Sequence, residues 1–414
     1  MAAKWLCCNV ASASTPPTPL ISERFVDEGN FADLGLGISP LEEVVAAVAT
    51  AGVVRHLAVV ADDLTGAADA AAPFAVHGLR VSVALSGPPA PDAEVLALLT
   101  DNRWRPPDEA AARMRSAVGQ VREWDPQMLF VKIDSVLRGQ VRADVSGALS
   151  AWPASGAVAT PAFPAQGRTV RDGVLLVHGR PAVDRVAEHF PDGVRVVDAE
   201  THDDLVAVAR GIVQSGSLAV GSGGLARALA GVIVDPRGAD RTPPPGPGVQ
   251  GVLVVAGSPH PVTRDQVAEL EAAGAEVVPD GPDAVAATTK ALTGGRRVVL
   301  TCRPDDDVAP EGPAAAALAA RLARTAVAVV DAVPSVGLVL TGGTTALAVA
   351  TALGASELRL SAEVAEGLPR GELVARERRV PVVTKSGGFG ARDALRRAAQ
   401  ALEAAQQTAL EEKA

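Results

Sequence analysis

Short apolar runs that end in polar or glycine-rich turns, each followed by a helical pattern, recur along this chain of 414 residues. In the stretch 57–69, LAVVADDLTGAAD, an apolar run meets two adjacent carboxylates, Asp62 and Asp63, and a helix is expected to begin near Ala67. Alternating strands and helices predict an α/β fold with mainly parallel sheets. In open sheets of this kind the ligand crevice lies outside the carboxyl ends of the strands, so a site is expected at these turns.

Four later turns share this pattern. They are KIDSVLRG at 132–139, AGSPHPVT at 256–263, LTGGTT at 340–345 and TKSGGFG at 384–390. Each follows a run of apolar residues that suits a buried strand. We therefore expect two α/β lobes that bring five strand-end turns together.

A proline- and glycine-rich stretch at 236–248, PRGADRTPPPGPG, is the clearest domain boundary. Three consecutive prolines and alternating glycine and proline can continue neither a helix nor a central strand. We expect an N-terminal extension of unknown role at 1–54, a first domain at 55–235, a linker at 236–250 and a second domain at 251–414. The extension contains one expected helix, Pro40–Ala51, with Pro40 in its first turn.

Composition argues against several classes of partner. The net charge is −10 and no Lys/Arg-rich run is present, so binding to nucleic acid or to an anionic membrane surface is not expected. Tyrosine is absent and aromatic residues make up 3% of the chain, which argues against stacking platforms for single-stranded nucleic acid. No uninterrupted apolar run approaches the ~20 residues of a membrane span. The net negative charge is still compatible with an anionic small-molecule ligand, because backbone amides of glycine turns and a few cationic side chains can bind it locally.

The cysteines indicate a reducing compartment. Cys7, Cys8 and Cys302 form neither a disulfide framework nor a zinc-binding spacing. The N-terminus has too short an apolar run for a signal peptide. We therefore expect a cytoplasmic protein, with Cys302 as a packed or partly buried thiol at the end of a strand.

The adjacent carboxylates Asp62 and Asp63 allow two interpretations. A carboxylate at a strand end can hold a substrate hydroxyl, take its proton, or bind Mg²⁺ through water. Alternatively, one of the two caps the next helix, because Asp is a preferred N-cap residue. With two acids, one can cap the helix while the other acts on a substrate.

The turn 132–139 brings a lysine, an acid, a hydroxyl and an arginine around one bend: Lys132, Asp134, Ser135 and Arg138. Such a set can hold a polyhydroxylated acid, with Arg on the carboxylate and Asp on the hydroxyls. A capped helix start with a solvated salt bridge is the alternative. Arg103 and Arg168 also follow strands and are candidates for further carboxylate clamps, although a lone Arg in such a place is more often a surface charge.

Three glycine turns in the second half favour a nucleotide site. Glycine leaves backbone N–H groups free to point at phosphate oxygens, and helix N-termini add a favourable dipole. Lys385, just before Gly387 and Gly388, can add a point charge. None of these turns matches the P-loop pattern GxxxxGK[ST] or the dinucleotide-binding pattern GxGxxG. Each turn alone is also common in ordinary loops. His260 is expected at a helix start rather than as a general base.

Six motifs, in order along the chain, together resemble one family. They are ADD-x-TG-A at 61–67, K-x-D-S-x-L-R-G at 132–139, P-A-F-P-x-x-G-R-T at 161–169, G-S-x-x-P-V-T at 257–263, TGG at 341–343 and TKSGGFG at 384–390. The chain resembles the four-carbon acid sugar kinases, which phosphorylate threonate, erythronate or 3-oxo-tetronate with ATP. The resemblance runs from about residue 57 to about residue 401. It implies an N-terminal sugar-acid-binding lobe and a C-terminal nucleotide-binding lobe.

The resemblance and the turn chemistry together assign candidate residues to each ligand. The sugar acid would contact Asp62, Asp63, Arg103, Lys132, Asp134, Ser135, Arg138, Gly139 and Arg168. ATP would contact Ser258, Gly342, Gly343, Thr344, Thr345, Lys385, Gly387 and Gly388. The ligands of the expected Mg²⁺ stay unassigned.

The expected reaction is phosphorylation of the terminal 4-hydroxyl of a four-carbon sugar acid. Asp62 or Asp63 would orient or deprotonate this hydroxyl, and Arg103 and Arg138 would hold the substrate carboxylate. The glycine turns and Lys385 would hold the triphosphate of ATP, with Mg²⁺ bridging its oxygens. Closure of the lobes would exclude water.

Departures from the family pattern keep two alternatives open. The stretch between Gly179 and Val194 is short, which is compatible with a different small sugar acid or polyol as substrate. Thr344 stands where the family often has an acidic residue, and residues 1–54 have no counterpart in it. Both features are compatible with a catalytically idle nucleotide-binding or regulatory protein. The oligomeric state is open, and a homodimer is one of the options.

Overall fold

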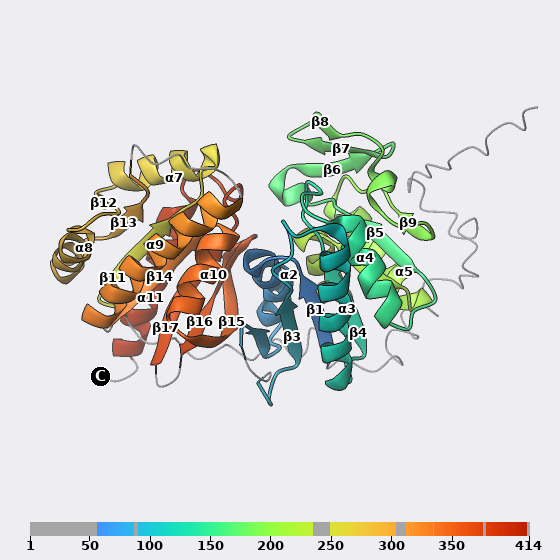
Figure 1. Cartoon of the computed structure of the whole chain (residues 1–414), viewed down its shortest axis with the longest axis horizontal. Helices are drawn as coiled ribbons and strands as arrows, with labels where there is room; N and C mark the ends of the chain where they lie inside the picture. The colour runs from blue at the N-terminus through green and yellow to red at the C-terminus, as the bar shows by residue number, and fades with distance from the viewer. Residues whose placement is uncertain are drawn as a thin grey trace, which may run out of the picture.

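The computed structural model describes residues 56–411 apart from 87–89, 235–248, 304–311, 334 and 376–377, and it describes side chains as far as residue 404. The expected extension, its helix and linker residues 236–248 lie outside the described residues. Figure 1 shows two α/β halves side by side, a blue-to-green half and a yellow-to-red half. We refer to residues 56–234 as the first half and to residues 249–411 as the second half.

The first half is built on a parallel sheet of strongly apolar strands. The strands are β1 (Leu57–Ala61), β2 (Val81–Ala84), β3 (Val95–Leu99), β4 (Met128–Lys132), β5 (Ala157–Thr160), β9 (Val194–Val196) and β10 (Leu218–Gly221). The helices are α2 (Leu64–Val76), α3 (Pro107–Glu123), α4 (Val141–Ala151), α5 (His202–Ser215) and α6 (Gly223–Ile233). The strand order is β2-β3-β1-β4-β10-β5-β9, with all neighbours parallel. Every residue of β1, β2 and β5 is buried, as is typical of strands covered on both faces.

The second half contains a second parallel block. Its strands are β11 (Gly251–Ala256), β12 (Glu276–Pro279), β13 (Val298–Thr301), β14 (Val336–Thr341) and β17 (Arg378–Lys385), in the order β12-β13-β11-β14-β17. Its helices are α7 (Pro261–Ala272), α8 (Ala284–Thr293), α9 (Gly312–Ala332), α10 (Gly343–Ala352) and α11 (Ala394–Glu411). Val252 and Val254 of β11 join a core with α7 and α11, while Leu253 and Val255 join the core under α8, α9 and α10. This alternation places the helices on both faces of the sheet.

An antiparallel hairpin, which we did not predict, joins the two blocks. It consists of β15 (Ala355–Ala365) and β16 (Leu368–Ala375). Since β16 pairs with β17 and β15 pairs with β2, one sheet of 14 strands runs through both halves. One buried apolar cluster also contains residues of both halves. The predicted class, two α/β lobes with mainly parallel strands, is confirmed, and the shared sheet is an addition to it.

A smaller sheet lies at the upper end of the first half in Figure 1. It contains β6 (Arg168–Arg171), β7 (Val174–Val177) and β8 (Arg180–Val183), and two short 3₁₀ helices flank it, η2 (Pro164–Gln166) and η3 (Val186–His189). β6 and β7 pair as an antiparallel hairpin. Gly167 has a φ of 70° and packs directly on the His178 ring, which ties η2 to the turn after β7.

Helix α9 is the one helix among the described residues that is long and apolar enough, by length and composition alone, to cross a membrane. It has 21 residues and a mean hydropathy of 1.4 over its most apolar window. It packs against α8, α10 and β11, and Leu318 and Leu322 lie in the shared core. Arg321, on the same helix, pairs with Asp280 at 2.8 Å. These contacts are typical of a helix that covers a sheet.

Candidate active site

The acid turn after β1 is fixed by the start of α2. Asp63 is the N-cap residue: its Oδ1 accepts the Gly66 N–H at 2.8 Å and its Oδ2 accepts the Thr65 hydroxyl at 2.9 Å. The helix begins at Leu64, earlier than the expected start near Ala67, because this cap draws Thr65 and Gly66 into the first turn. The interpretation that one of the two acids caps the helix is confirmed.

Arg103, in the loop after β3, holds both acids. Its Nε and Nη2 donate to the two oxygens of Asp62 at 2.6 and 2.7 Å, and its Nη1 donates to Asp63 Oδ2 at 3.2 Å. Charged bidentate pairs of this kind are strong, and Asp62 is only 3% exposed. We expected Arg103 to clamp a substrate carboxylate. In this structure the two acids occupy its guanidinium, so its visible role is to shape the acid turn.

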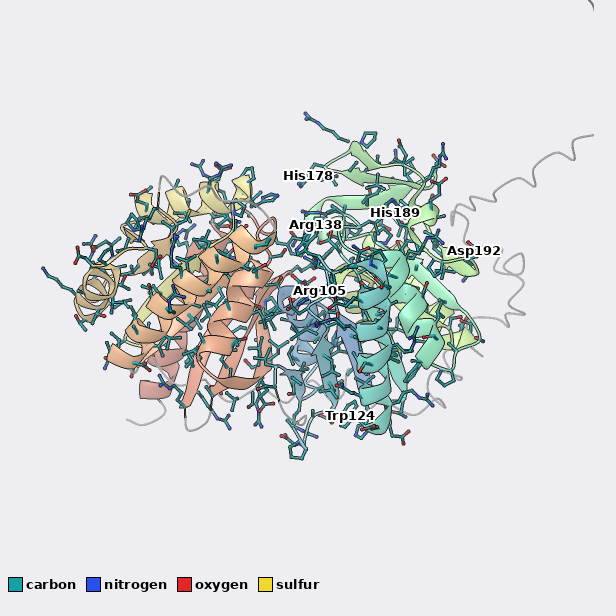
Figure 2. All side chains as sticks on the ribbon, viewed as in Figure 1. Arg105, Trp124, Arg138, His178, His189 and Asp192 are labelled. Carbon is teal, nitrogen blue, oxygen red and sulfur yellow. The ribbon has the colours of Figure 1, made fainter. Side chains whose placement is uncertain are left out.

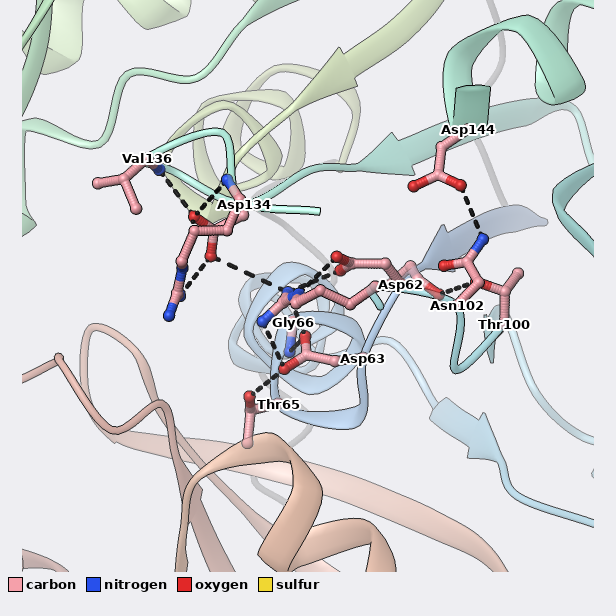
Figure 3. Close-up of polar contacts among 12 residues, drawn as sticks. Asp62, Asp63, Thr65, Gly66, Thr100, Asn102, Asp134, Val136 and Asp144 are labelled. Carbon is pink, nitrogen blue, oxygen red and sulfur yellow. Dashed lines mark hydrogen bonds and ion pairs between the residues drawn. The ribbon is translucent and has the colours of Figure 1, made fainter. Parts of the chain in front are cut away.

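The turn 132–139 closes over these residues, as Figure 3 shows. Asp134 accepts from the Val136 N–H at 3.0 Å and from Nε and Nη2 of Arg138 at 3.1 and 2.5 Å. The same carboxylate lies 3.9 Å from Arg103 Nη2. A Cβ added at Gly139 would lie 3.1 Å from Arg103 Cγ, so this turn needs a glycine to approach so closely. The predicted sugar-acid residues apart from Arg168 therefore form one cluster, with the buried Ser135 next to Asp134.

Lys132 enters this cluster from the end of β4 and is 6% exposed. Its side chain crosses the first turn of α2 at Gly66. A Cβ at that position would lie 3.0 Å from Lys132 Nζ and 2.5 Å from Asp63 Oδ1. Glycine at 66 therefore leaves space for both side chains.

Two carboxylates of the cluster are held in the ionised form. Burial opposes the charge of Asp63, but Arg103 and Lys132 outweigh it and hold the pKa of Asp63 below its ordinary value. Burial also opposes the charge of Asp134, and Arg103 and Arg138 hold its pKa well below the usual range. Both groups can therefore accept hydrogen bonds from a hydroxyl at neutral pH.

Three buried polar residues near the cluster were not predicted. Asn102 donates to Asp144 Oδ1 at 2.7 Å, and burial together with the neighbouring Asp62 raises the pKa of Asp144 to about 7. Asp69, on α2, is 4% exposed, and neither of its oxygens has a hydrogen-bond partner among the described residues. Burial raises the pKa of Asp69 to about 7. A lone acid in the alanine-rich sequence of α2 was the available signal for Asp69, whereas Asn102 and Asp144 carried none.

The glycine turns of the second half meet around Ser258. A Cβ at Gly387 would collide with Ser258 Oγ, and one at Gly342, where φ is 97°, would lie 3.4 Å from Ser258 Cβ. Thr263 Oγ1 donates to the Gly387 carbonyl at 2.8 Å. At the start of α10, Thr345 is buried against Gly257 and Thr344 is exposed. The structure thus brings the residues predicted to contact ATP together at one edge of the second half, which we call the glycine rim.

His260 begins α7, as expected, with its Nδ1 accepting the Val262 N–H at 3.2 Å. A Cβ at Gly388 would lie 3.1 Å from His260 Nε2. Burial lowers the pKa of His260, and the charge of Arg138 from the first half lowers it further. Figure 2 shows Arg138 on the upper part of the first half, toward the second half, whereas Trp124 lies at the lower edge. The strand-end turns of both halves therefore face each other.

Lys385 was expected to add a point charge for a phosphate. The structure buries it to 1% exposure and directs its Nζ at three backbone carbonyls: Ser386 at 2.9 Å, Gly387 at 3.2 Å and Phe389 at 3.2 Å. Burial lowers the pKa of Lys385 to about 7, while three carbonyl acceptors favour the ammonium form. Because its donors are used within its own turn, Lys385 holds the shape of that turn rather than reaching outward.

The two halves touch at the acid turn itself. Gly343, the first residue of α10, lies so close to Asp63 that a Cβ would collide with Asp63 Oδ2 and lie 3.2 Å from Thr65 Oγ1. Figure 3 shows the orange α10 directly below Thr65. The N-termini of α2 and α10 therefore converge on one small region. Both helix ends carry partial positive charge, which favours an anionic group there.

A second contact between the halves involves Arg168, which we expected to bind substrate. Its Nη2 donates to the Gly388 carbonyl at 3.3 Å, and its guanidinium carbon lies 5.1 Å from the centroid of the Phe389 ring. The neighbouring Gln166 donates to the Glu366 carbonyl at 2.9 Å, at the tip of the β15–β16 hairpin. In this structure Arg168 therefore connects the small-sheet region to the last glycine turn.

Matches to known families define the class of protein. Residues 57–192 match a family described as a sugar-binding N-terminal domain, and residues 253–395 match one described as a nucleotide-binding C-terminal domain. The acid cluster lies in the first region, and the glycine rim lies in the second. The chain is thus a two-lobed α/β protein that pairs a sugar-binding lobe with a nucleotide-binding lobe.

Full-length relatives narrow this class to one family. A D-threonate kinase from Bordetella bronchiseptica is 36% identical over 407 residues, which cover 84% of this chain and 97% of that protein. A 3-oxo-tetronate kinase from Methylobacterium radiotolerans is 28% identical over 424 residues, covering 83% of this chain and 98% of that protein. The chain belongs to the four-carbon acid sugar kinase family, as the six motifs predicted.

A solved structure supports the fold. A crystal structure from Salmonella typhimurium LT2, provisionally described as a tRNA synthase, matches with a TM-score of 0.64 at 20% identity. The match covers 83% of this chain and 98% of that one. At this identity the likeness concerns the architecture alone.

Proposed function

We propose that this protein transfers the γ-phosphoryl group of ATP to the terminal 4-hydroxyl of a four-carbon sugar acid, with D-threonate as the first substrate to test. Family membership supports the kinase class and a four-carbon acid sugar as acceptor. D-threonate takes precedence because the D-threonate kinase from Bordetella bronchiseptica is 36% identical, against 28% for the 3-oxo-tetronate kinase. D-erythronate and 3-oxo-tetronates are the neighbouring candidates.

One observation carries the proposal: the N-terminus of α10, at Gly343, lies against the capping carboxylate Asp63. A triphosphate on the glycine rim would have its last phosphate at the N-terminus of α10, where backbone N–H groups and the helix dipole favour it. The acid cluster would hold the hydroxyls of the sugar acid on the other side. Donor and acceptor would then meet at Asp63.

Positioning accounts for most of the proposed catalysis. Asp63 accepts a hydrogen bond from the attacking hydroxyl and takes its proton as the new O–P bond forms. The bond between the γ-phosphorus and the bridging oxygen breaks, and ADP leaves with that electron pair. A base with a lowered pKa suffices, because charge in a loose phosphoryl transition state lies mainly on the transferred group. Arg138, which pairs with Asp134 but keeps 45% of its side chain exposed, would meet the substrate carboxylate.

Mg²⁺ would neutralise charge on the triphosphate. No group of three or more His, Cys, Asp or Glu side chains among the described residues is arranged to hold a metal ion. A nucleotide-borne Mg²⁺ needs fewer protein ligands, because phosphates and water complete its shell. Asp63 fits this role as the carboxylate beside α10, and would hold the ion through water.

A substrate panel tests the proposal. ADP release from Mg-ATP would be followed with D-threonate, D-erythronate, their L-forms and 3-oxo-tetronates, with glycerol as a polyol control. Turnover with one acid well above the rate without acceptor is the expected result. ATP binding with no acceptor-dependent turnover would contradict the proposal and favour a nucleotide-binding regulatory protein. The domain division with a linker at 236–250, a cytoplasmic location and a homodimer stay predictions.

A further inference from the structure

The buried cations of the described residues differ in what their charged groups contact. Lys385 donates to three carbonyls, and Arg168 donates to two carbonyls and lies over Phe389. Lys132 is 6% exposed, yet its ammonium makes no hydrogen bond and no ion pair with any residue that the structure describes. Its charge acts on Asp63, Asp69 and Asp134, but a largely buried ammonium that donates no hydrogen bond is costly, so a ligand is expected to complete its surroundings.

The position of Lys132 indicates what that ligand is. Its Nζ lies at the first turn of α2, beside Gly66 and on the Oδ1 side of Asp63. Gly343, the first residue of α10, lies against Oδ2 of the same carboxylate. The ammonium and the N-terminus of α10 thus flank one group, and a phosphoryl group in transit between the lobes would lie within reach of both.

A second buried group without hydrogen bonds, Asp69, lies near Lys132. Asp69 is 4% exposed and both of its oxygens lack hydrogen bonds among the described residues. Gly223, at the start of α6, lies so close that a Cβ would collide with the Asp69 carboxylate. After burial, Lys132 is the largest influence on the ionisation of Asp69. The two groups are therefore suited to act as charge and counter-charge.

We propose that Lys132 is a catalytic residue whose ammonium contacts the phosphoryl group in transit, and that Asp69 is a positioning residue that supplies the counter-charge behind it. The inference deepens the proposed kinase function and rests on it. In the transition state, charge spreads over the equatorial oxygens of the phosphoryl group, and a fixed ammonium stabilises it there. Lys132 exchanges no proton in this step: the substrate oxygen bonds to phosphorus, its proton passes to Asp63, and ADP departs with the electron pair of the broken bond.

The first test compares Lys132→Met with Lys290→Met, the same change at an exposed lysine on α8. We expect K132M to lower kcat by roughly 10²–10³-fold. The KM values for ATP and for the sugar acid should change little, because the lost contact forms mainly in the transition state. Lys132→Ala should regain part of its kcat when methylammonium or ethylammonium is added, an effect that a purely structural role would not produce.

The second test is the pH dependence of Asp69→Asn. The groups that face Asp69 are Lys132 of β4, Glu363 of β15, Arg227 of α6 and Asp63 before α2. If the ionised carboxylate positions Lys132, wild-type kcat should rise with pH as Asp69 loses its proton near neutrality. D69N should lower kcat by roughly tenfold or more, leave KM little changed, and remove this rise.

Three outcomes separate the possible failures. A K132M enzyme with kcat within about twofold of wild type would overturn the inference, since one charge on the transferred group is worth far more. A higher KM for the sugar acid at unchanged kcat would assign Lys132 to substrate binding instead. If wild type phosphorylates no sugar acid, the proposed function fails. The slow hydrolysis of ATP by water then tests Lys132 by itself: it should fall in K132M and stay at the wild-type rate in K290M.

Discussion

Asp63 combines three contacts that belong to different parts of the account. It caps α2, accepts from Arg103 and lies against Gly343 of the other half. The cap could be expected from local sequence, because N-cap preferences act within three residues. The other two contacts join positions far apart in the chain and could not be predicted from it.

Replacing Asp63 by Asn separates the cap from the charge. Asn caps helices about as well as Asp, so the cap is kept. The lost charge no longer pairs with Arg103, so the free energy of unfolding should fall by about 1–3 kcal/mol. The lost carboxylate should lower kcat roughly 10²-fold or more if Asp63 accepts the hydroxyl proton. Asp63→Ala also loses the cap, which costs about 1 kcal/mol more. Steady-state kinetics with denaturant unfolding measures both, and near-normal turnover in D63N would refute the assignment.

Asp144 should make the stability of the protein depend on pH. Burial raises its pKa from 3.8 to about 7, so the folded state holds a proton that the unfolded state releases. This stabilisation is complete below pH 4 and is lost as the pH rises through 7. In Asp144→Asn, which keeps an acceptor for Asn102, the loss is absent. The stability difference between wild type and variant should therefore shift by about 2–3 kcal/mol between pH 5 and pH 8, in favour of the variant at high pH.

Urea unfolding of both proteins at the two pH values measures this shift. Asp69 titrates in the same range and with the same sign, but it is present in both proteins and cancels in the difference. A stability difference that does not vary with pH would mean that Asp144 is ionised in the folded protein, despite its burial.

The contacts of Arg103 and Lys385 could not be predicted from the sequence. Both were expected to face a ligand anion, because each cation follows a strand. In the structure Arg103 meets acids 40 and 41 residues earlier, and Lys385 folds back onto the carbonyls of its own turn. Charge and location along the chain identify such residues as important, whereas their partners depend on the tertiary fold.

At the scale of elements, the contact between the start of α10 and the start of α2 is the one that matters most for the proposed reaction. Gly343→Ala places a methyl group against the Asp63 carboxylate, so the two helix starts must move apart. We expect kcat to fall roughly tenfold or more, because small displacements at a reacting centre are costly. Gly231→Ala, in α6 with open space around it, is the matched control. It should keep full activity and gain about 0.5–1 kcal/mol of stability.

Unchanged turnover in G343A, measured beside G231A, would mean that the approach of α10 to α2 has no part in catalysis. Loss of activity in both variants would instead indicate that the fold tolerates no added methyl group in its helices.

Buried strands that end in a polar turn were the elements that the sequence predicted best. The apolar run of β1 was expected within its observed bounds, because all of its residues are buried and a short continuous apolar run gives a strong signal. The β15–β16 hairpin was missed, since Pro369 and Gly371 are unfavourable in strands. Gly371 fits there because it lies against the backbone of Arg359 on the neighbouring strand, a contact that only the folded sheet reveals.

At the scale of the whole molecule, the shared sheet predicts cooperative behaviour. The 14-stranded sheet and one apolar cluster pass through both halves. Domains that share a buried core are not expected to unfold separately. Differential scanning calorimetry should show one heat-absorption peak, which shifts upward when ATP or the sugar acid is added. Two well-separated peaks would contradict the continuity of the core.

The most direct test of the central claim is a ³¹P NMR spectrum of ATP and D-threonate incubated with the enzyme and Mg²⁺. The account predicts ADP together with one new phosphomonoester signal, split by two protons of the terminal carbon, which identifies phosphorylation at the 4-hydroxyl. A phosphomonoester coupled to a single proton would place the reaction at another hydroxyl. ADP and inorganic phosphate without any ester would contradict the claim that the acid cluster presents a sugar acid to the nucleotide at Asp63.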